Sequence, residues 1–590
     1  MPLDIPQLRR NRSAPCQRTF LKLFALVQIA SVANRIVMYR NAIYVRKVDV
    51  VEESISEFDV VVLGSGAAGL TAAIAASDSG ASVGIFEKSA FLGGTTAMSG
   101  GVIWMPNNHH QQEHEIEDSR EKALRYLESL SLGQIDSDMA ATFVDRGPEM
   151  LKWVEENTPC SFHIVESYSD YHPEHPGGIG NGGRSLDNAL FPLPELGEWA
   201  KKIRNDGMRS PVMITETPLG GAAAPPSSEV MRDRTERGES GMGLALVAAL
   251  LKGVVDRGIE PEIESRALRL LKDGTGICGV SIKSGDSEKE VIARKGIIIA
   301  TGGFEWNPEL VRTFLRGPMT APVGNPENTG DGLEMAMEAG ARLGNMRNAW
   351  WVPVTRIPGE NLFGHPSSRL IITERTRPHS LMVNKYGVRF TNEAGNYNAM
   401  GGAFHNFDPQ KFEYQNIPCW LIFDHHYKLR YDIAGNRPGE HTPDWMHASE
   451  TMQGLAEAIG VPPESLDATV ERFNEYASIG EDPDFHRGES AYDAFNGDQS
   501  LDGVQATLQA LDTPPFYAIK IESGSLGTNG GPKTDVSGRV LSIEGGVIPG
   551  LFAAGNAMAA PTGMVYGGAG GTIGPAMTFG YIAGRAAASR

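Results

Sequence analysis

The feature that most constrains this chain is a glycine-rich loop set between a buried strand and a helix. Residues 58–63 form an apolar run rich in β-branched side chains, which predicts a buried strand. The loop Gly-Ser-Gly-Ala-Ala-Gly follows at residues 64–69, and the alanine-rich residues 70–76 predict a helix. A second predicted strand covers residues 82–86 and ends directly before Glu87. This order of strand, loop, helix, strand and acid predicts a βαβ unit that binds a dinucleotide.

Each residue type in this unit has a mechanical reason for its place. Gly64 permits the tight turn after the strand, Gly66 lets a pyrophosphate approach the backbone, and Gly69 lets helix and strand pack closely. The helix N-terminus offers free N–H groups and the positive end of a dipole to the phosphates. Glu87 stands where a carboxylate would bind the ribose hydroxyls. This context supports a nucleotide site much better than the glycine spacing alone would.

The segments that follow favour FAD over NAD. A glycine-rich run at residues 88–101 would let the backbone lie along an extended cofactor. Two more apolar strands end in glycine, at residues 296–303 and 550–556, so the nucleotide-binding domain is predicted to be assembled from both ends of the chain. A plainer interpretation is that these are only further strands of an α/β sheet, and both interpretations can hold. No histidine lies in residues 93–101, so we expect FAD to be bound non-covalently.

The residues expected to contact FAD come from these segments and from the start of a C-terminal helix. This helix would open near Pro575, where a missing N–H does no harm. Its positive end would face the flavin edge on which negative charge accumulates during reduction. The predicted contacts are Gly64, Ser65, Gly66, Ala67, Ala68, Gly69, Glu87, Lys88, Gly94, Thr95, Thr96, Ser99, Gly101, Ala300, Thr301, Gly302, Gly555, Asn556, Thr572 and Ile573.

A chain of 590 residues is too long for one compact core, so we expect it to fold as several domains. The predicted fold class is α/β, with a Rossmann-like FAD-binding domain and an inserted α+β catalytic domain. Residues 55–345 and 517–590 are assigned to the FAD-binding domain, residues 346–516 to the catalytic domain, and residues 1–54 to a basic extension. We expect the substrate to lie between the two domains, at the flavin.

The first 50 residues differ from the rest of the chain, with nine Lys and Arg against two acids. An apolar stretch at residues 23–30 follows a basic run and is too short to span a bilayer. One interpretation is a targeting segment or an interfacial anchor; the other is an extension without stable structure, or a misassigned start. We therefore expect a cytoplasmic or organellar protein, with weak membrane association only through this segment.

Charge and ligand spacing exclude two classes of partner. The chain carries 53 Lys and Arg against 72 Asp and Glu, a formal net charge of −19, whereas nucleic-acid binding needs a basic face. The four cysteines form no CxxC pair. His109, His110 and His114 show no closed metal-ligand spacing, and neither do His425 and His426, so no metal is expected.

Four motifs carry a resemblance to a known family. They are SGGVIWMPN at residues 99–107, DYHPE with PGG and GRSL within residues 170–186, GVRFTNE followed by Tyr397, and YGGAGGTIGP at residues 566–575. Together they resemble the fumarate reductase/succinate dehydrogenase flavoprotein superfamily and, more closely, its 3-ketosteroid Δ1-dehydrogenase branch. The resemblance runs from about residue 58 to the C-terminus, and the last motif is the most specific. It implies an FAD-dependent oxidoreductase of steroid metabolism, acting on a CH–CH bond, with a hydrophobic small-molecule substrate and an external electron acceptor.

The resemblance also implies roles for individual residues, by motif match. Tyr566 and the backbone amide of Gly570 would polarise the C3 carbonyl of the substrate. Tyr397 would remove the C2 proton while flavin N5 accepts the hydride from C1, which leaves a C1=C2 double bond. Tyr171 would support Tyr397 by hydrogen bonding, with Tyr168 as the second candidate. This is sensible chemistry, because donors on the carbonyl stabilise an enolate and a partner phenol helps tyrosine, a poor base, to act as an anion.

One position departs from the family pattern, and several functions stay open. Gly567 stands where steroid dehydrogenases of this family commonly carry proline, which predicts a looser loop. Between Gly545 and Gly584 there is no Arg, Lys, His or acid, whereas a fumarate-type site needs cations to hold two carboxylates. A hydrophobic ketone such as a steroid, a triterpenoid or another cyclic enone is therefore favoured. The alternatives are an ene reductase of the fumarate reductase type, a ketosteroid dehydrogenase acting on a different bond, and a flavoprotein scaffold or redox sensor.

Overall fold

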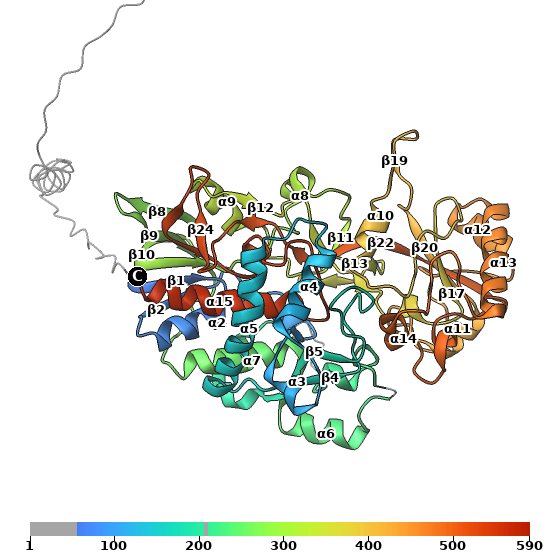
Figure 1. Cartoon of the computed structure of the whole chain (residues 1–590), viewed down its shortest axis with the longest axis horizontal. Helices are drawn as coiled ribbons and strands as arrows, with labels where there is room; N and C mark the ends of the chain where they lie inside the picture. The colour runs from blue at the N-terminus through green and yellow to red at the C-terminus, as the bar shows by residue number, and fades with distance from the viewer. Residues whose placement is uncertain (1–55, 206–209, 223) are drawn as a thin grey trace, which may run out of the picture. The chain divides into compact units, whose positions relative to one another are not determined.

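The computed structural model describes residues 56–205, 210–222 and 224–590, which are coloured in Figure 1. The chain divides into a unit of residues 1–54 and a compact unit of residues 55–590. The basic N-terminal extension lies outside the described residues, so both interpretations of it remain predictions. None of the helices within the described ranges has both the length and the apolar character that crossing a bilayer requires.

The first sheet joins strands from both ends of the chain, as Figure 1 shows. Its order is β2 (Val83–Phe86), β1 (Ser56–Leu63), β10 (Ser287–Ile299), β25 (Val547–Ala553) and β24 (Arg539–Leu541). All except β24 run parallel. In the register of these strands Leu63 faces both Phe86 and Ile299, and Ile299 faces Ala553. The carboxyl ends are therefore level, and the loops that follow them open at one edge of the sheet.

The C-terminal helix completes this domain by crossing the first helix at very short range. A Cβ atom added at Gly580 would lie 2.4 Å from the backbone oxygen of Ala68, and one added at Gly584 would lie 2.3 Å from that of Ala72. Only glycine allows backbones to approach this closely. The two helices are α2 (Ala67–Asp78) and α15 (Ile573–Ala588). Their crossing brings the two predicted cofactor segments together, although these lie at opposite ends of the chain.

Further elements extend and cover this domain. The antiparallel β8 (Ser265–Asp273) and β9 (Gly276–Ser284) pair with the first half of β10. The helix α7 (Met242–Val255) is apolar on nearly every side and packs on α2, while α4 (Arg120–Leu130) and α5 (Ser137–Asn157) pack on each other. A small sheet has the order β3 (Ile103–Trp104), β5 (Gly182–Asn188) and β4 (Phe162–Glu166). Residues of the two motif segments beside this sheet, Val102 and Tyr171, line the same cavity as the nucleotide loop.

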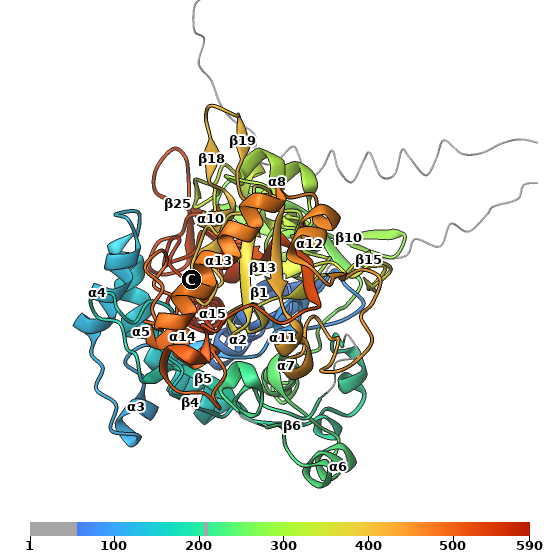
Figure 2. The ribbon, with the colours of Figure 1, turned by 90° about the vertical axis from the view of Figure 1, so that its right-hand side faces the viewer.

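The second sheet belongs to the catalytic part of the chain and is mainly antiparallel. Its order is β16 (Arg369–Leu370), β13 (Ala349–Thr355), β22 (Phe516–Thr528), β20 (Cys419–Phe423) and β17 (Ser380–Asn384), with β11 (Ala321–Pro322) and β21 (His447–Ser449) beside β22. Alternate side chains of its strands enter different cores: Leu381 and Val383 face one cluster and Met382 another. The first of these clusters includes residues of α12 (Met452–Ile459) and α13 (Pro463–Ile479), which Figure 2 shows in orange.

The predicted fold class is confirmed: a Rossmann-like FAD-binding domain carries an inserted α+β part. The proposed domain limits at 345/346 and 516/517 remain predictions. The strands β11 and β22 both pair in the second sheet, one from before and one from after the predicted insert. Shorter helices complete the structure: α3 (His109–Glu113), α6 (Ser228–Glu236), α8 (Pro308–Phe314), α9 (Asp331–Glu338), α10 (Met400–Phe404), α11 (His425–Arg430) and α14 (Ala491–Asn496).

Candidate active site

The glycine loop is shaped by contacts that exclude any side chain at two of its positions. Gly64 has a φ of 106°, and a Cβ atom there would lie 2.3 Å from the oxygen of Ala300 on the neighbouring segment. A Cβ atom at Gly69 would lie 2.1 Å from the oxygen of Gly64, which fixes the approach of α2 to β1. At Gly66 the nearest atom to an added Cβ would be Oγ1 of Thr96, at 3.6 Å. The loop is therefore packed tightly behind and remains open at Gly66.

The Glu87 carboxylate is held rigidly at the end of β2. Its Oε2 accepts hydrogen bonds from the Ser65 hydroxyl at 2.6 Å and the Ser65 backbone N–H at 3.1 Å, and its Oε1 accepts one from the Ser89 N–H at 2.9 Å. Burial raises the pKa of Glu87, and these hydrogen bonds oppose the rise. Glu87 lines a cavity that begins at the nucleotide loop, and its hydrogen bonds fix the orientation of its carboxylate there.

One cavity connects the nucleotide loop to the predicted catalytic tyrosines. Of the predicted cofactor residues only Gly69 does not line it, because Gly69 lies behind the loop against Gly64. The predicted residues that do line it are Gly64, Ser65, Gly66, Ala67, Ala68, Glu87, Lys88, Gly94, Thr95, Thr96, Ser99, Gly101, Ala300, Thr301, Gly302, Gly555, Asn556, Thr572 and Ile573, together with Tyr168, Tyr171, Tyr397, Tyr566 and Gly570.

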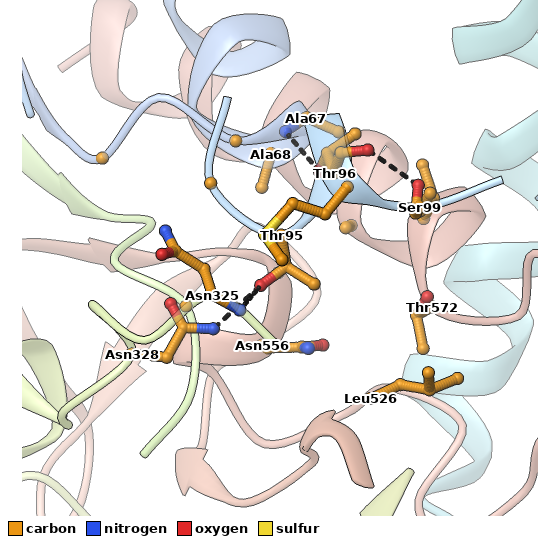
Figure 3. A pocket seen from close by; sticks show the side chains of 18 of the residues that line it. Ala67, Ala68, Thr95, Thr96, Ser99, Asn325, Asn328, Leu526, Asn556 and Thr572 are labelled. Carbon is orange, nitrogen blue, oxygen red and sulfur yellow. Dashed lines mark hydrogen bonds between the residues drawn. The ribbon is translucent and has the colours of Figure 1, made fainter. Parts of the chain in front are cut away.

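A loop at residues 323–331 also lines the cavity, and sequence reasoning missed it. Thr95 Oγ1 accepts hydrogen bonds from the Asn325 backbone N–H and from Asn328 Nδ2, each at 3.0 Å (Figure 3). On the other side of the same glycine-rich run, Thr96 Oγ1 accepts a bond from the Ala67 N–H at 3.1 Å. The only local signal for the loop was a run of turn-forming residues, Gly-Asn-Pro-Glu-Asn-Thr-Gly, which indicates a loop but no ligand.

The arrangement of donors at this cavity fits FAD. The N-cap residues of α2 and α15 are Gly66 and Thr572. Neither helix has a side-chain cap hydrogen bond, and both N-termini border the cavity. Exposed helix N-termini attract anionic groups. The first would hold the pyrophosphate, the second would face the flavin, and Glu87 would take the ribose hydroxyls. Lys88, which borders the same end, is paired with Asp331 at 3.3 Å and Glu327 at 3.9 Å.

At the other end of the cavity three tyrosine hydroxyls form a continuous hydrogen-bonded chain. Tyr171 donates to Tyr397 across 2.6 Å, and Tyr397 donates to Tyr566 across 3.1 Å. The rings of Tyr171 and Tyr566 are stacked with their centroids 5.2 Å apart. The partner of Tyr397 is thus Tyr171, while Tyr168 stacks on Phe495 at 4.4 Å. The three predicted tyrosines come from a loop after β4, a loop after β17 and the loop before α15, and only the fold brings them together.

Burial dominates the electrostatics of this cluster. It raises the pKa of Tyr171 and of Tyr397 well above the ordinary value, and the neighbouring phenols raise both further. The hydrogen bond from Tyr171 acts in the opposite sense and lowers the pKa of Tyr397. Burial also raises the pKa of Tyr566, while hydrogen bonds with Tyr397 and Thr572 lower it. A phenolate here therefore depends on its hydrogen-bond partners, because burial disfavours the charged form.

The loop that carries Tyr566 is fixed firmly to the small sheet. The oxygen of Gly567 accepts hydrogen bonds from the Tyr126 hydroxyl at 2.8 Å and the Tyr171 N–H at 3.0 Å. Added Cβ atoms at Gly567 and Gly568 would lie 2.7 Å and 2.5 Å from the Trp104 ring. The looser loop predicted from Gly567 is therefore wrong: the loop packs closely on the Trp104 indole, and the Gly567 oxygen accepts two hydrogen bonds.

Gly570 adopts a backbone conformation that requires glycine. Its φ is 91°, and an added Cβ atom would lie 2.4 Å from the carbonyl carbon of Ile103. Among the residues that the structure describes, the Gly570 N–H donates to no backbone or side-chain acceptor. Gly570 and Tyr566 both line the cavity from the same loop, so this loop carries a backbone N–H and a hydroxyl that can donate hydrogen bonds.

The wall around the tyrosines is apolar. The charged residues that line the cavity within the described ranges are Glu87, Lys88, Glu327 and Asp331, which lie with the nucleotide segments. The side chains around the tyrosines are neutral and mostly apolar: Val102, Ile214, Leu219, Val323, Leu362, Leu370, Ile372 and Leu526. Several belong to one buried cluster with Tyr171, Tyr397 and Tyr566. This end of the cavity suits a hydrophobic molecule with a single hydrogen-bond acceptor.

Comparisons with known proteins give matches along nearly the whole chain. The model of the FAD binding domain family matches residues 59–573. The chain is 40% identical over 542 residues to 4-oxocyclohexanecarboxylate 2-dehydrogenase of Sinomonas cyclohexanicum, across 91% of this chain and 93% of that protein. It is 38% identical over 567 residues to 3-oxosteroid 1-dehydrogenase of Mycobacterium tuberculosis, across 90% and 98%. The crystal structure of the 3-ketosteroid Δ1-dehydrogenase from Sterolibacterium denitrificans in complex with 1,4-androstadiene-3,17-dione gives a TM-score of 0.84 at 32% identity, across 91% of this chain and 100% of that one.

Proposed function

This chain belongs to the FAD binding domain family, in its 3-ketosteroid Δ1-dehydrogenase-like branch, and we propose that it desaturates the C1–C2 bond of a 3-ketosteroid-like ketone. The branch is part of the fumarate reductase/succinate dehydrogenase flavoprotein superfamily. The chain is therefore an FAD-dependent dehydrogenase that acts on CH–CH groups. The observation that carries the proposal is the hydrogen-bonded chain of Tyr171, Tyr397 and Tyr566 in an apolar cavity that also borders the nucleotide loop.

The reaction needs two hydrogens removed from adjacent carbons next to a carbonyl. The Tyr566 hydroxyl and the Gly570 N–H would bind the carbonyl oxygen and stabilise the enolate that forms as the C2 proton leaves. Tyr397 would take this proton, and the hydrogen bond from Tyr171 would make its phenolate form accessible. When bound, FAD supplies the acceptor for the hydride from C1. The electrons then pass to an external acceptor, and the product carries a C1=C2 double bond.

The lining of the cavity favours a neutral, bulky substrate. A carboxylate held in an apolar pocket without a cation is costly, because a buried charge needs a partner. Around the tyrosines the described lining offers hydroxyls and apolar side chains, and no Arg, Lys or His. A steroid or related terpenoid ketone would bury its apolar rings against this wall and use its one carbonyl on Tyr566 and Gly570.

A second candidate is a small cyclic oxo-carboxylic acid. It is supported by the 40% identity to a 4-oxocyclohexanecarboxylate 2-dehydrogenase, a protein that this chain resembles along 91% of its own length. The chemistry at the carbonyl would be the same, so the tyrosines do not distinguish the two. The charge of the substrate does, and the cavity lining is the reason to prefer the steroid-like ketone.

The deciding experiment compares the two substrates on the same enzyme. Purified protein with its FAD is mixed anaerobically with 4-androstene-3,17-dione or with 4-oxocyclohexanecarboxylate, and bleaching of the visible flavin absorbance is followed. We expect bleaching by the steroid, with a product that has lost two hydrogens, and little by the acid. Bleaching by the acid and none by several steroids or triterpenoid ketones would overturn the steroid assignment. Tyr566→Phe serves as the control, because it should bind FAD equally well and bleach much more slowly.

We also propose that the FAD is bound non-covalently. Covalent attachment needs a nucleophilic side chain such as histidine or cysteine at the flavin, and the described lining of the cavity contains neither. Acid precipitation of the purified enzyme should release all of the yellow colour into the supernatant. Colour that stays with the precipitate after washing would contradict this.

A further inference from the structure

Two neighbouring residues of one segment pair with two neighbouring residues of another at the tyrosine cluster. Tyr171 is followed by His172, and Tyr397 is preceded by Asn396. The hydroxyls of Tyr171 and Tyr397 lie 2.6 Å apart, and His172 Nε2 and Asn396 Nδ2 also lie 2.6 Å apart. The second pair, here called the His172–Asn396 contact, thus joins the same two segments as the Tyr171–Tyr397 pair. It does so outside the cavity, since neither residue lines it.

The hydrogen bonds around Asn396 define the protonation state of His172. Asn396 Oδ1 accepts a hydrogen bond from the Ala399 backbone N–H at 2.9 Å, so the oxygen of this amide is already oriented. The NH₂ group must then face His172 Nε2, and this nitrogen can only accept. The proton of the neutral ring therefore sits on Nδ1, which lies 3.3 Å from Glu174 Oε1. The His172–Asn396 contact therefore fits the neutral Nδ1–H form of His172, in which both ring nitrogens have hydrogen-bond partners.

Protonation of His172 would break the His172–Asn396 contact. A proton on Nε2 would point at the NH₂ group of Asn396, which has no lone pair to accept it. Glu174 and His175 face the ring from its own loop, and the Tyr126 hydroxyl of α4 accepts the His172 backbone N–H. The His172 side chain is 31% exposed, so protons can reach it from water.

We propose that neutral His172 is a positioning residue: through Asn396 it holds the Tyr397 hydroxyl in hydrogen-bond contact with that of Tyr171. Protonation of His172 would loosen the contact between the two tyrosines and slow desaturation. The proposal rests on the proposed function for its effect on rate. The physical reason is that a proton-abstracting group must be held within hydrogen-bond distance of its partner and its substrate. Loss of the contact leaves substrate binding in place, because the apolar wall is unaffected, so kcat falls while KM changes little.

Three variants test this through pH profiles of kcat. His172→Gln keeps a side chain that can accept from Asn396 and cannot titrate. Asn396→Asp supplies a carboxylate that can accept from the protonated ring and still accept from the Ala399 N–H. His175→Gln is the matched control, because His175 is the neighbouring histidine and contacts Ser129 instead. Between about pH 8 and 5 the wild type and His175→Gln should lose kcat more steeply than His172→Gln and Asn396→Asp, with a difference of roughly ten-fold accumulated at pH 5.

A second readout does not depend on turnover. In ¹⁵N-histidine spectra the resonance missing from His172→Gln identifies His172, and at pH 8 the wild type should show a proton on Nδ1 and none on Nε2. Asn396→Asp should keep the ring doubly protonated to higher pH. An Nε2–H form in the wild type, or the same acid limb in all four proteins, would overturn the proposal. Absence of turnover in every protein with a normal His172 spectrum would instead count against the proposed function.

Discussion

The hydroxyl of Tyr171 lies 2.6 Å from the hydroxyl of Tyr397, although 226 residues separate the two in the chain. Neither residue is close to the other in any local element: one follows a strand of the small sheet and the other follows a strand of the second sheet. Both side chains are almost completely buried and line the same cavity. At this distance the Tyr171 hydroxyl can stabilise a phenolate on Tyr397 by a hydrogen bond. We therefore expect mutation to separate the roles of the two residues.

Removing either hydroxyl of this pair should slow the reaction in different ways. Tyr397→Phe deletes the proposed base, and we expect kcat to fall by about 10²- to 10⁴-fold. In Tyr171→Phe the base remains, but the hydrogen bond that lowers its pKa is lost. If the phenolate is the active form, the pH profile of kcat should then move to higher pH. Stopped-flow flavin reduction measures both effects, with Tyr476→Phe on α13 as control. A Tyr171→Phe profile that superimposes on the wild type would contradict the assignment.

The two proposed donors to the substrate carbonyl, Tyr566 and Gly570, should both be necessary for full activity. Tyr566→Phe removes one donor, and we expect a fall in kcat of about 10²- to 10³-fold with FAD content unchanged. Gly570→Ala places a methyl group 2.4 Å from the Ile103 carbonyl carbon at a φ of 91°, so the loop must move and the N–H is displaced. It should impair catalysis at least as severely. Retention of more than half of the wild-type kcat in either variant would argue against a carbonyl site at this loop.

The crossing of α2 and α15 should control FAD retention. Gly584→Ala adds a methyl group 2.3 Å from the Ala72 oxygen, and overpacking of this kind costs roughly 1–3 kcal/mol. Because α2 begins at the nucleotide loop, we expect purified Gly584→Ala to show a lower ratio of flavin to protein absorbance and a lower Tm. The same substitution at Gly402, where nothing lies within 4 Å, should leave both unchanged. Equal FAD content in the two variants would show that the crossing is not critical.

A buried ion cluster in the catalytic part should make stability depend on acid pH. Burial by itself would raise the pKa of Glu393, but the guanidinium groups of Arg389 and Arg487 outweigh it and lower the pKa to about 2. Because the folded pKa lies below the ordinary value, the stabilisation is complete above about pH 4.5 and is lost as the pH falls toward 2. The Tm, measured between pH 7 and 2.5, should therefore fall more steeply with decreasing pH below about pH 4.5 than above it.

Glu393→Gln tests the same cluster at neutral pH. It leaves a buried guanidinium without its partner, and we expect a loss of roughly 3–5 kcal/mol in the free energy of unfolding together with a shallower acid dependence. Glu360→Gln is the control, because its pair with Arg369 lies at the surface and should contribute at most about 1 kcal/mol. Equal losses in the two variants would show that burial does not determine the strength of the pair.

The nucleotide half of the site was accessible to sequence reasoning because it is made of local signals. The strand before Gly64, the alanine-rich helix and the strand before Glu87 lie next to one another in the chain, and each is specified by its own residue types. Two distant strands could be added because they end in the same way, and parallel strands place such ends at one edge. The loop with Asn325 and Asn328 carries only turn residues, so its place beside Thr95 was not predictable.

Residue types alone could not place the tyrosines. A resemblance to a family suggested Tyr171, Tyr397 and Tyr566. Without it, the sequence does not distinguish these residues from any buried structural tyrosine whose hydroxyl has a hydrogen-bond partner. Their meeting depends on the packing of the small sheet, the second sheet and the Gly567 loop, which are contacts between distant parts of the chain. The same holds for His172 and Asn396, whose pairing has no periodic or motif signal at all.

Local sequence signals therefore account for the dinucleotide-binding unit: the residues from Phe58 to Glu87 form it because strand, turn, helix and acid are each local properties of the chain. The proposed reaction centre follows only from the tertiary structure, since the 2.6 Å contact between Tyr171 and Tyr397 forms only when the small sheet and the second sheet pack together. Short-range preferences fix elements, whereas the distance between two side chains far apart in the chain is set by every layer packed between them.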